Sequence, residues 1–432
     1  MARSLRVALA MLVTASLTTI ALPAQAKSLG DDDDYKKVAY FLQWGVYGRN
    51  FHVKDIDTSG AAAKLTHVNY AFGNVSEDGK CFVTPTAGQG DPWADYQQRL
   101  PANLTVDGVA DEWGQPLAGN FNQLKKLKAK HPNLKVLMSL GGWSWSRFFS
   151  NAALTPASRT AFVESCIDIW LKGNLPVFSP DPQGGPGSGF GVFDGFDIDW
   201  EWPNWTANVG NVIRPEDREN FTALLAEFRK QLNAYGKQVR RKYELTAYLP
   251  ANPRAITAGI EVNKIFKYLD FGTIQGYDLH GPWSGTTGHG SNLYTDPNDP
   301  NPIRFSNDAT IQNYIAQGAP RHKLVLGVPS YSQSWTNVNH PGGNGLFQPG
   351  TGVASLDYRT VANLPGPRFR NPATGALWLY NGTDFHSYDD PAQMHQKARY
   401  IKRNGLGGSM MWSLDQDDAN ASLTKALARV LD

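Results

Sequence analysis

The sequence has little that would indicate a charged partner or a metal cofactor. Its 432 residues contain 41 Lys and Arg against 39 Asp and Glu, so the formal net charge is only +2. This balance does not favour binding to nucleic acid or to an anionic surface. The His residues form no HExxH pattern, and neither cysteine has metal-ligand spacing. We therefore expect no metal and no other cofactor.

Cysteine is scarce, and the sequence leaves the state of its two cysteines open. In an exported protein, Cys81 and Cys166 could form a disulfide. However, Cys166 lies in a predicted helix, residues 159–172, on the same side as the apolar residues Phe162, Ile169 and Trp170. A buried free thiol is therefore an equal alternative.

Long apolar runs are lacking after the N-terminus. Residues 1–26 resemble a secretory signal, with basic Arg3 and Arg6, an apolar run over residues 7–22 and a small-residue cleavage site at 24–26. A membrane anchor is the alternative, but the run is short for a span and contains several Thr and Ser. We therefore expect cleavage and a mature chain, residues 27–432, that is secreted, extracellular and free of the membrane.

The most informative feature that is present is an acidic segment, residues 193–203, with the sequence FDGFDIDWEWP. Successive side chains of a strand point to opposite faces. We therefore expect Asp197, Asp199 and Glu201 to share one face of a buried strand. The other face would carry the large apolar residues Phe196, Ile198, Trp200 and Trp202.

Three carboxylates in a row repel one another, and burying them costs free energy. Residues 173–213 contain no Lys or Arg that could neutralise them locally. Such an arrangement tends to keep a carboxyl group protonated near neutral pH, as a general acid requires. A calcium loop would need Gly where Trp202 stands. A structural ion-pair network remains an alternative, above all for Asp194 and Asp197.

Short apolar runs alternate along the chain with longer amphipathic stretches. The predicted strands are residues 38–43, 65–72, 134–140, 193–200, 243–248, 271–276, 323–328 and 407–412. Helical patterns lie between most of them, for example at residues 120–130, 215–235 and 391–404. This order predicts an α/β fold, most simply a closed (β/α)8 TIM barrel. An open doubly wound sheet is the alternative, but no Gly-rich phosphate motif follows the first strand.

Two long connections interrupt this regular order. Residues 79–119 separate the second and third predicted strands, and residues 336–386, rich in Gly, Asn and Pro, follow the seventh. Long connections inside a compact domain are usually functional, and after a barrel strand they border the active-site face. We therefore expect one catalytic barrel with a small inserted subdomain at about residues 336–386.

Five motifs along the chain resemble one family, the family 18 glycoside hydrolases or chitinases. Residues 194–201 (DGFDIDWE) look like its DxxDxDxE motif, and residues 139–143 (SLGGW) resemble its SxGG motif. Residues 41–51 (FLQWGVYGRNF) and 407–412 (GGSMMW) are similar to the first and last strands of bacterial members. Residues 275–278 (QGYD) match the MxYD motif except at the first position. The resemblance implies a secreted bacterial-type chitinase whose inserted subdomain is α+β.

The resemblance also implies a mechanism and its residues. Chitin or N-acetylglucosamine oligosaccharides would be cut at β-1,4 bonds with retention, assisted by the 2-acetamido group of the substrate. Glu201 would protonate the glycosidic oxygen, Asp199 would orient the acetamido group, and Asp197 would share a proton with Asp199. Tyr277 would hydrogen-bond the acetamido carbonyl. The expected substrate-binding residues are Trp412 beneath the cleaved sugar, Asp278, Trp143, Trp44, Tyr331 and Gln275.

The sequence departs from the family pattern at two positions. Gln275 replaces the usual Met, and Gln333 stands where many relatives have an Arg two residues after Tyr331. Neither departure touches Glu201. An endo-β-N-acetylglucosaminidase acting on N-glycan cores is an alternative function, because it uses the same chemistry. A non-catalytic chitin-binding lectin is another, although the presence of the acid Glu201 argues against it. We expect the protein to be a monomer.

Overall fold

A closed barrel of parallel strands forms the centre of the protein. A computed structural model describes residues 35–432, so the predicted signal at residues 1–26 lies outside the described residues. The barrel strands follow the order β1-β14-β8-β7-β6-β5-β4-β2, and β1 also pairs with β2, which closes the ring. Their bounds are β1 Lys36–Leu42, β2 His67–Val75, β4 Lys135–Gly141, β5 Gly195–Asp199, β6 Glu244–Leu249, β7 Phe271–Ile274, β8 Leu324–Pro329 and β14 Gly408–Trp412.

All of the predicted strands overlap these barrel strands, so the predicted TIM barrel is confirmed. A short strand, β3 (Cys81–Phe82), adds to β2 in the antiparallel direction within the long connection that follows β2. All barrel strands run the same way, so the segments that follow them meet at the carboxyl end of the barrel. This end carries the active site in enzymes with this fold.

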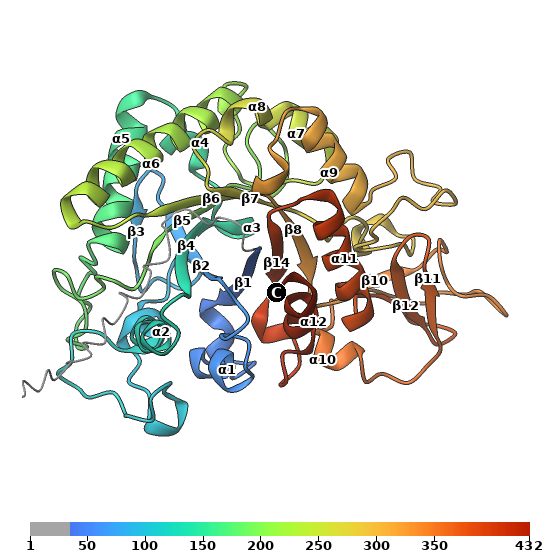
Figure 1. The fold of residues 1–432 in the computed structure, drawn as a ribbon, viewed down its shortest axis with the longest axis horizontal. Helices are drawn as coiled ribbons and strands as arrows, with labels where there is room; N and C mark the ends of the chain where they lie inside the picture. The colour runs from blue at the N-terminus through green and yellow to red at the C-terminus, as the bar shows by residue number, and fades with distance from the viewer. Residues whose placement is uncertain (1–34) are drawn as a thin grey trace, which may run out of the picture. The chain divides into compact units, whose positions relative to one another are not determined.

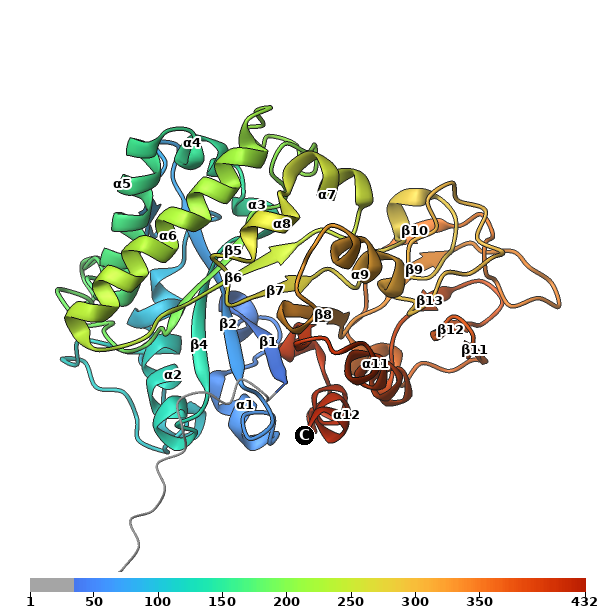
Figure 2. The same ribbon diagram turned by 45° about the horizontal axis from the view of Figure 1, so that its top comes forward.

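Helices surround the barrel on its outside (Figure 1). Figure 2 shows the same ring of helices after a turn of 45° about the horizontal axis. The predicted helices are confirmed, for example by α6 (Asp217–Val239) and α11 (Pro391–Asn404). The other helices are α1 Val53–Thr58, α2 Gly119–Lys130, α3 Gly142–Trp145, α4 Phe149–Ala153, α5 Pro156–Cys166, α7 Pro253–Gly259, α8 Val262–Ile265, α9 Asn307–Ala316, α10 Tyr358–Val361 and α12 Ser422–Leu431.

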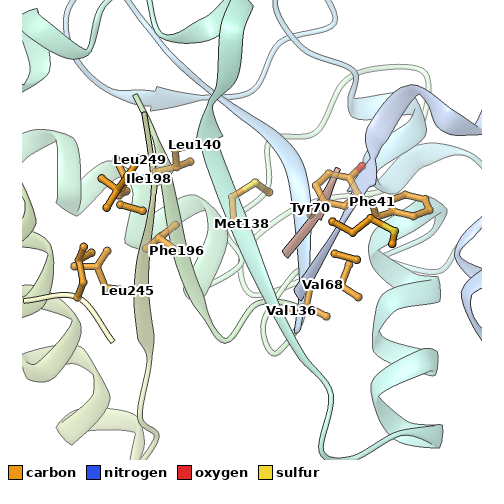
Figure 3. Packing of buried hydrophobic residues seen from close by; sticks show 14 of the residues in the cluster. Phe41, Val68, Tyr70, Val136, Met138, Leu140, Phe196, Ile198, Leu245 and Leu249 are labelled. Atoms are coloured by element: carbon orange, nitrogen blue, oxygen red, sulfur yellow. The ribbon is translucent and has the colours of Figure 1, made fainter. Parts of the chain in front are cut away.

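The main hydrophobic core lies between the outer face of the strands and these helices. Phe196 and Ile198 of β5 belong to it, and the Phe196 ring packs 5.5 Å from that of Phe228 on α6. Figure 3 shows how side chains from neighbouring strands join in this core. The prediction that Phe196 and Ile198 share one buried face is therefore confirmed; this face points outward to the helices, and the alternate residues Asp197 and Asp199 point into the barrel.

The alternation predicted for the acidic segment stops earlier than expected. The prediction that Trp202 shares the face of Phe196 and Ile198 is wrong, because Trp202 packs inside the barrel, 5.2 Å from the ring of Tyr248. The physical reason is that β5 ends at Asp199, so the chain turns before it reaches Trp202. Trp200 still packs outward, stacked on Phe149 at 5.4 Å.

A second sheet lies in the connection between β8 and α11. It is antiparallel, with the order β10-β9-β13-β12-β11 (Figure 1, orange to red). Its strands are β9 Gln333–Thr336, β10 Thr351–Val353, β11 Arg368–Asn371, β12 Ala376–Tyr380 and β13 Phe385–Ser387, and the connection also contains the short helix α10. A small core of its own, which includes Trp335, Trp378 and Phe385, fills this inserted sheet.

The structure pairs the two cysteines, whose state the sequence left open. Cys81 of β3 and Cys166 at the end of α5 form a disulfide between positions 85 residues apart. The bond ties the connection after β2 to a helix on the outside of the barrel. Within residues 35–432, no helix has both the length and the apolar character needed to cross a membrane.

Replacing both cysteines by Ala should lower the free energy of unfolding by about 2–4 kcal/mol, because the disulfide restricts the unfolded chain. Urea unfolding measures the effect. A reductant present throughout unfolding should lower the midpoint of the native protein and leave that of the double variant unchanged. Equal midpoints for the native protein with and without reductant would show that the bond does not stabilise the fold.

Candidate active site

Asp197 lies fully buried at the centre of the barrel and accepts hydrogen bonds from hydroxyl groups. Tyr40 Oη and Ser139 Oγ donate to Asp197 Oδ2 at 2.7 and 2.9 Å, and Thr246 Oγ1 donates to Oδ1 at 2.6 Å. Burial raises the pKa of Asp197, whereas these donors lower it. Since the donors are neutral and come from β1, β4 and β6, barrel closure itself holds this carboxyl group in place.

Asp199 and Glu201 continue the row toward the carboxyl end of the barrel. Asp199 is buried and Glu201 is partly exposed. Burial, and then the charges of Glu201 and Asp197, raise the pKa of Asp199 well above its usual range. Burial and then the charge of Asp278 raise the pKa of Glu201 to about 8. The interaction between the two side chains raises the pKa of Asp199 further and lowers that of Glu201. At neutral pH the pair therefore holds a proton that an exposed carboxyl group would lose.

Close backbone packing fixes the turn that carries Glu201. The Glu201 N–H donates to Ser146 Oγ at 2.8 Å, and the same hydroxyl group lies 2.9 Å from the Asp199 carbonyl oxygen. Gly141, at the end of β4, has a φ of 107°. A Cβ there would lie 2.3 Å from the Asp199 carbonyl oxygen, so only glycine fits. The SLGGW segment thus supports the acidic row from the neighbouring strand.

Tyr277 follows β7 and lies buried beside the acidic row. Its ring stacks against that of Tyr248 with 6.1 Å between centroids, and its hydroxyl group lies 4.0 Å from Met410 Sδ. Burial, with the negative charges of Asp199, Asp278 and Glu201, raises the Tyr277 pKa well above its usual value. Its hydroxyl group therefore remains a hydrogen-bond donor at any physiological pH.

Asp278 is the fourth carboxyl group of the site. Tyr331 Oη donates to Asp278 Oδ1 at 2.6 Å, and the Gln333 side-chain amide donates to the same oxygen. Burial raises the pKa of Asp278, and both donors lower it. The backbone of Asp278 has a φ of 53°, in the left-handed region that non-glycine residues rarely adopt. Tyr331 and Gln333 follow β8, so the connection to the inserted sheet contributes directly to the site.

The expected aromatic residues lie at the carboxyl ends of barrel strands. Trp412 ends β14 and packs against Tyr40 and Phe72, with ring centroids 5.0 and 5.7 Å away. Trp44 follows β1 and Trp143 follows β4, and these side chains are 41% and 52% exposed. An indole that is half exposed at this end of the barrel has a free face on which a ligand could stack.

Gln275 follows β7, and its side chain braces the barrel. Its Oε1 accepts a hydrogen bond from the Ala251 N–H at 3.0 Å, which connects the ends of β7 and β6. Asp194, considered above for an ion-pair role, lies 2.6 Å from Lys128 Nζ and 3.7 Å from Arg241, and it accepts the Val136 N–H. The ion-pair alternative is therefore confirmed for Asp194.

Several residues of the site were missed by the sequence analysis. Two of them, Tyr40 and Thr246, donate hydrogen bonds to Asp197. The others are Tyr248, which stacks on Tyr277, and Ser146, which accepts the Glu201 N–H. The available signal was period-two alternation, since Tyr40, Thr246 and Tyr248 are the inward residues of their strands. Among the described residues, no group of three or more His, Cys, Asp and Glu side chains is placed to hold a metal ion.

The comparison with protein families gives a match over almost the whole described chain. The profile described as "Glycosyl hydrolases family 18" matches residues 36–417. Chitinase A1 of Niallia circulans is 36% identical over 95% of this chain, and chitinase C of Streptomyces lividans is 37% identical over 89%. The chain spans only 60% and 58% of the length of these two relatives.

A solved structure supports the same relationship. The catalytic domain of the psychrophilic chitinase B from Arthrobacter TAD20 superposes with a TM-score of 0.89 at 47% sequence identity. The match covers 93% of this chain and 96% of that domain. The fold of this chain is therefore similar to that of the Arthrobacter domain over most of both chains.

Replacing Thr246 by Val should leave Asp197 Oδ1 without its hydrogen bond in a buried site. We expect a loss of about 1–3 kcal/mol in the free energy of unfolding and an increase in the Asp197 pKa. Thr246→Ser keeps the hydroxyl donor and is the control, with a smaller loss. Urea unfolding of the two variants gives the comparison, and equal stability would mean that the hydroxyl group does not support Asp197.

Proposed function

The chain belongs to family 18 of the glycosyl hydrolases, and we propose that it is a chitinase. It hydrolyses β-1,4 bonds between N-acetylglucosamine units of chitin and its oligosaccharides, with retention of configuration. The observation that carries this proposal is the row of carboxyl groups formed by Asp197 and Asp199 on β5 and by Glu201 just after it. Burial and neighbouring charges raise the pKa of both Asp199 and Glu201, which favours retention of a proton by this pair at neutral pH. A general acid next to an orienting carboxylate is what substrate-assisted cleavage requires.

In the first step, Glu201 gives its proton to the glycosidic oxygen as the bond from this oxygen to the anomeric carbon breaks. The carbonyl oxygen of the 2-acetamido group forms the new bond to the anomeric carbon, which gives an oxazolinium ion. Asp199 accepts a hydrogen bond from the acetamido N–H and balances the positive charge that develops there. Tyr277 donates to the acetamido oxygen and so holds it in line for attack.

In the second step, water opens the oxazolinium ion. Glu201, now a carboxylate, takes a proton from the water while the water oxygen bonds to the anomeric carbon. The acetamido oxygen leaves from the opposite face, so two inversions give net retention. Asp197 takes part by sharing a proton with Asp199. When Asp199 is protonated, Asp197 is ionised, and its three hydroxyl donors stabilise the negative charge. When Asp199 is ionised, Asp197 holds the proton.

A conventional retaining mechanism would use a second carboxylate as nucleophile, about 5–5.5 Å from the acid. Asp278 is the carboxyl group on another element that could be considered. Its Oδ1 already accepts hydrogen bonds from Tyr331 and Gln333, which suits a group that positions the substrate. The acetamido group of the substrate is therefore the better nucleophile for this site.

The exposed indoles supply the remaining substrate contacts in this proposal. Trp412 would lie beneath the sugar at the cleavage point, and Trp44 and Trp143 would stack on more distant sugars of a long chain. Chitin is an extracellular polymer, so we also propose that residues 1–26 direct export. An endo-β-N-acetylglucosaminidase would use the same row of carboxyl groups, and activity on an N-glycan core in place of chitin oligosaccharides would identify it.

Replacing Glu201 by Gln should abolish hydrolysis of chitin oligosaccharides, with a loss of about 10²-fold or more, because Gln has no transferable proton. Binding should survive. Calorimetric titration with a short oligomer checks the binding, and release of reducing sugar checks the activity. Near-normal turnover by this variant would contradict the assignment of Glu201.

The same substitution has a predicted effect on stability that depends on pH. The pKa of Glu201 is raised in the folded state, so its stabilising contribution is full below pH 4.5 and is lost as pH rises toward 8. Glu201→Gln should therefore be more stable than the native protein at pH 9, by on the order of 2 kcal/mol, because ionisation of the buried carboxyl group no longer opposes folding. Urea unfolding at pH 5 and pH 9 tests this difference.

Cleavage should depend on the acetamido group of the sugar on the non-reducing side of the bond. We expect hydrolysis of acetylated oligosaccharides and none of fully deacetylated ones, because glucosamine has no carbonyl oxygen to attack the anomeric carbon. A stable thiazoline mimic of the oxazolinium ion should inhibit. Efficient cleavage of fully deacetylated chitosan, measured under the same conditions, would refute substrate assistance.

A further inference from the structure

Gln333 is a residue of the inserted sheet whose side chain contacts the active-site residue Asp278. This residue begins β9, the strand next to β13, and it is buried. Across the sheet it pairs with Ser387, whose Oγ accepts the Gly290 N–H at 2.9 Å. A Cβ at Gly290 would lie 3.0 Å from Gln333 Cγ, so the backbone of the β7–α9 connection packs closely against Gln333. The side chain therefore has a fixed position.

From this position the Gln333 amide meets Asp278. Gln333 and Tyr331 both donate to Oδ1 of Asp278, one from an amide and the other from a phenol. Both donors are uncharged. They therefore hold the carboxylate in place but do not cancel its charge, as an arginine or lysine at the same position would.

The charge that remains on Asp278 acts on the catalytic acid. Burial has the largest effect on the pKa of Glu201, and the charge of Asp278 raises it further. Among the described residues, the titratable groups that interact with Glu201 include the carboxyl group of Asp199 on β5 and the phenols of Tyr248, Tyr277 and Tyr331. A positive charge placed among these groups would therefore lower the pKa of Glu201.

We propose that Gln333 is a positioning residue that orients Asp278 without adding a positive charge beside it, so that the charge at position 333 sets the alkaline limit of catalysis. This inference rests on the proposed function, because it concerns the proton of the general acid. It assigns to the inserted sheet a role in tuning the acid, separate from any contact that the sheet makes with a long substrate. With a neutral amide at position 333, the protein should stay active to higher pH than it would with a positively charged residue there.

The test compares Gln333→Lys with Gln333→Met. The two side chains have similar length and differ in charge, and the dependence of kcat/KM on pH reports the free enzyme, so contacts with substrate do not move it. With a soluble N-acetylglucosamine oligosaccharide, we expect the alkaline limb of Gln333→Lys to move down by on the order of one pH unit relative to Gln333→Met. The limb of Gln333→Met should stay close to that of the native protein.

Two further variants separate the possible outcomes. Thr351→Lys places the same charge on an exposed residue of the neighbouring strand β10, and its alkaline limb should not move. Asp278→Asn removes the charge itself and should move the alkaline limb of the kcat/KM profile to lower pH. This test remains even if Gln333→Lys does not fold. The same limb in Gln333→Lys and Gln333→Met, or an unmoved limb in Asp278→Asn, would overturn this inference. Failure of the native protein to hydrolyse the oligosaccharide would instead refute the proposed function.

Discussion

The burial of carboxyl groups inside the barrel is the constraint on which the rest of the site depends. Asp197 is fully buried and Asp199 nearly so, and desolvation alone would drive both to the neutral form. Three hydroxyl groups on three strands compensate for this cost at Asp197. At Asp199, burial and the charges of Glu201 and Asp197 instead raise the pKa well above its usual range. A closed barrel brings these partners together, since their strands β1, β4 and β6 are remote in sequence.

The same constraint explains the small residues around the row. The Asp199 carbonyl approaches Gly141 so closely that no Cβ fits, and Ser146 bonds both to this carbonyl and to the Glu201 N–H. The backbone of Glu201 is therefore held in place without any bond to its carboxyl group. Close packing between Gly141 of β4 and Asp199 of β5 thus fixes the turn from which the Glu201 side chain extends.

The barrel and the acidic row could be predicted from the sequence. The features that could not be predicted each have a physical reason. Period-two alternation correctly predicted that Phe196 and Ile198 share a buried face opposite Asp197 and Asp199. It failed at Trp202, because alternation holds only within a strand and β5 ends at Asp199. The hydroxyl partners Tyr40 and Thr246 were not recognised, since no local pattern tells which strands become neighbours. The disulfide remained open because helix amphipathicity explains a buried Cys166 equally well with or without a bond.

The inserted sheet shows why a departure from a family pattern is difficult to interpret without structure. In the sequence, Gln333 only lacks a charge that many relatives have. In the structure, its amide and the Tyr331 hydroxyl group converge on one oxygen of Asp278, whose charge in turn raises the pKa of Glu201. A neutral residue at position 333 therefore orients Asp278 without placing a positive charge beside it. The inserted sheet therefore affects the pKa of Glu201 indirectly, because Gln333 helps to position Asp278.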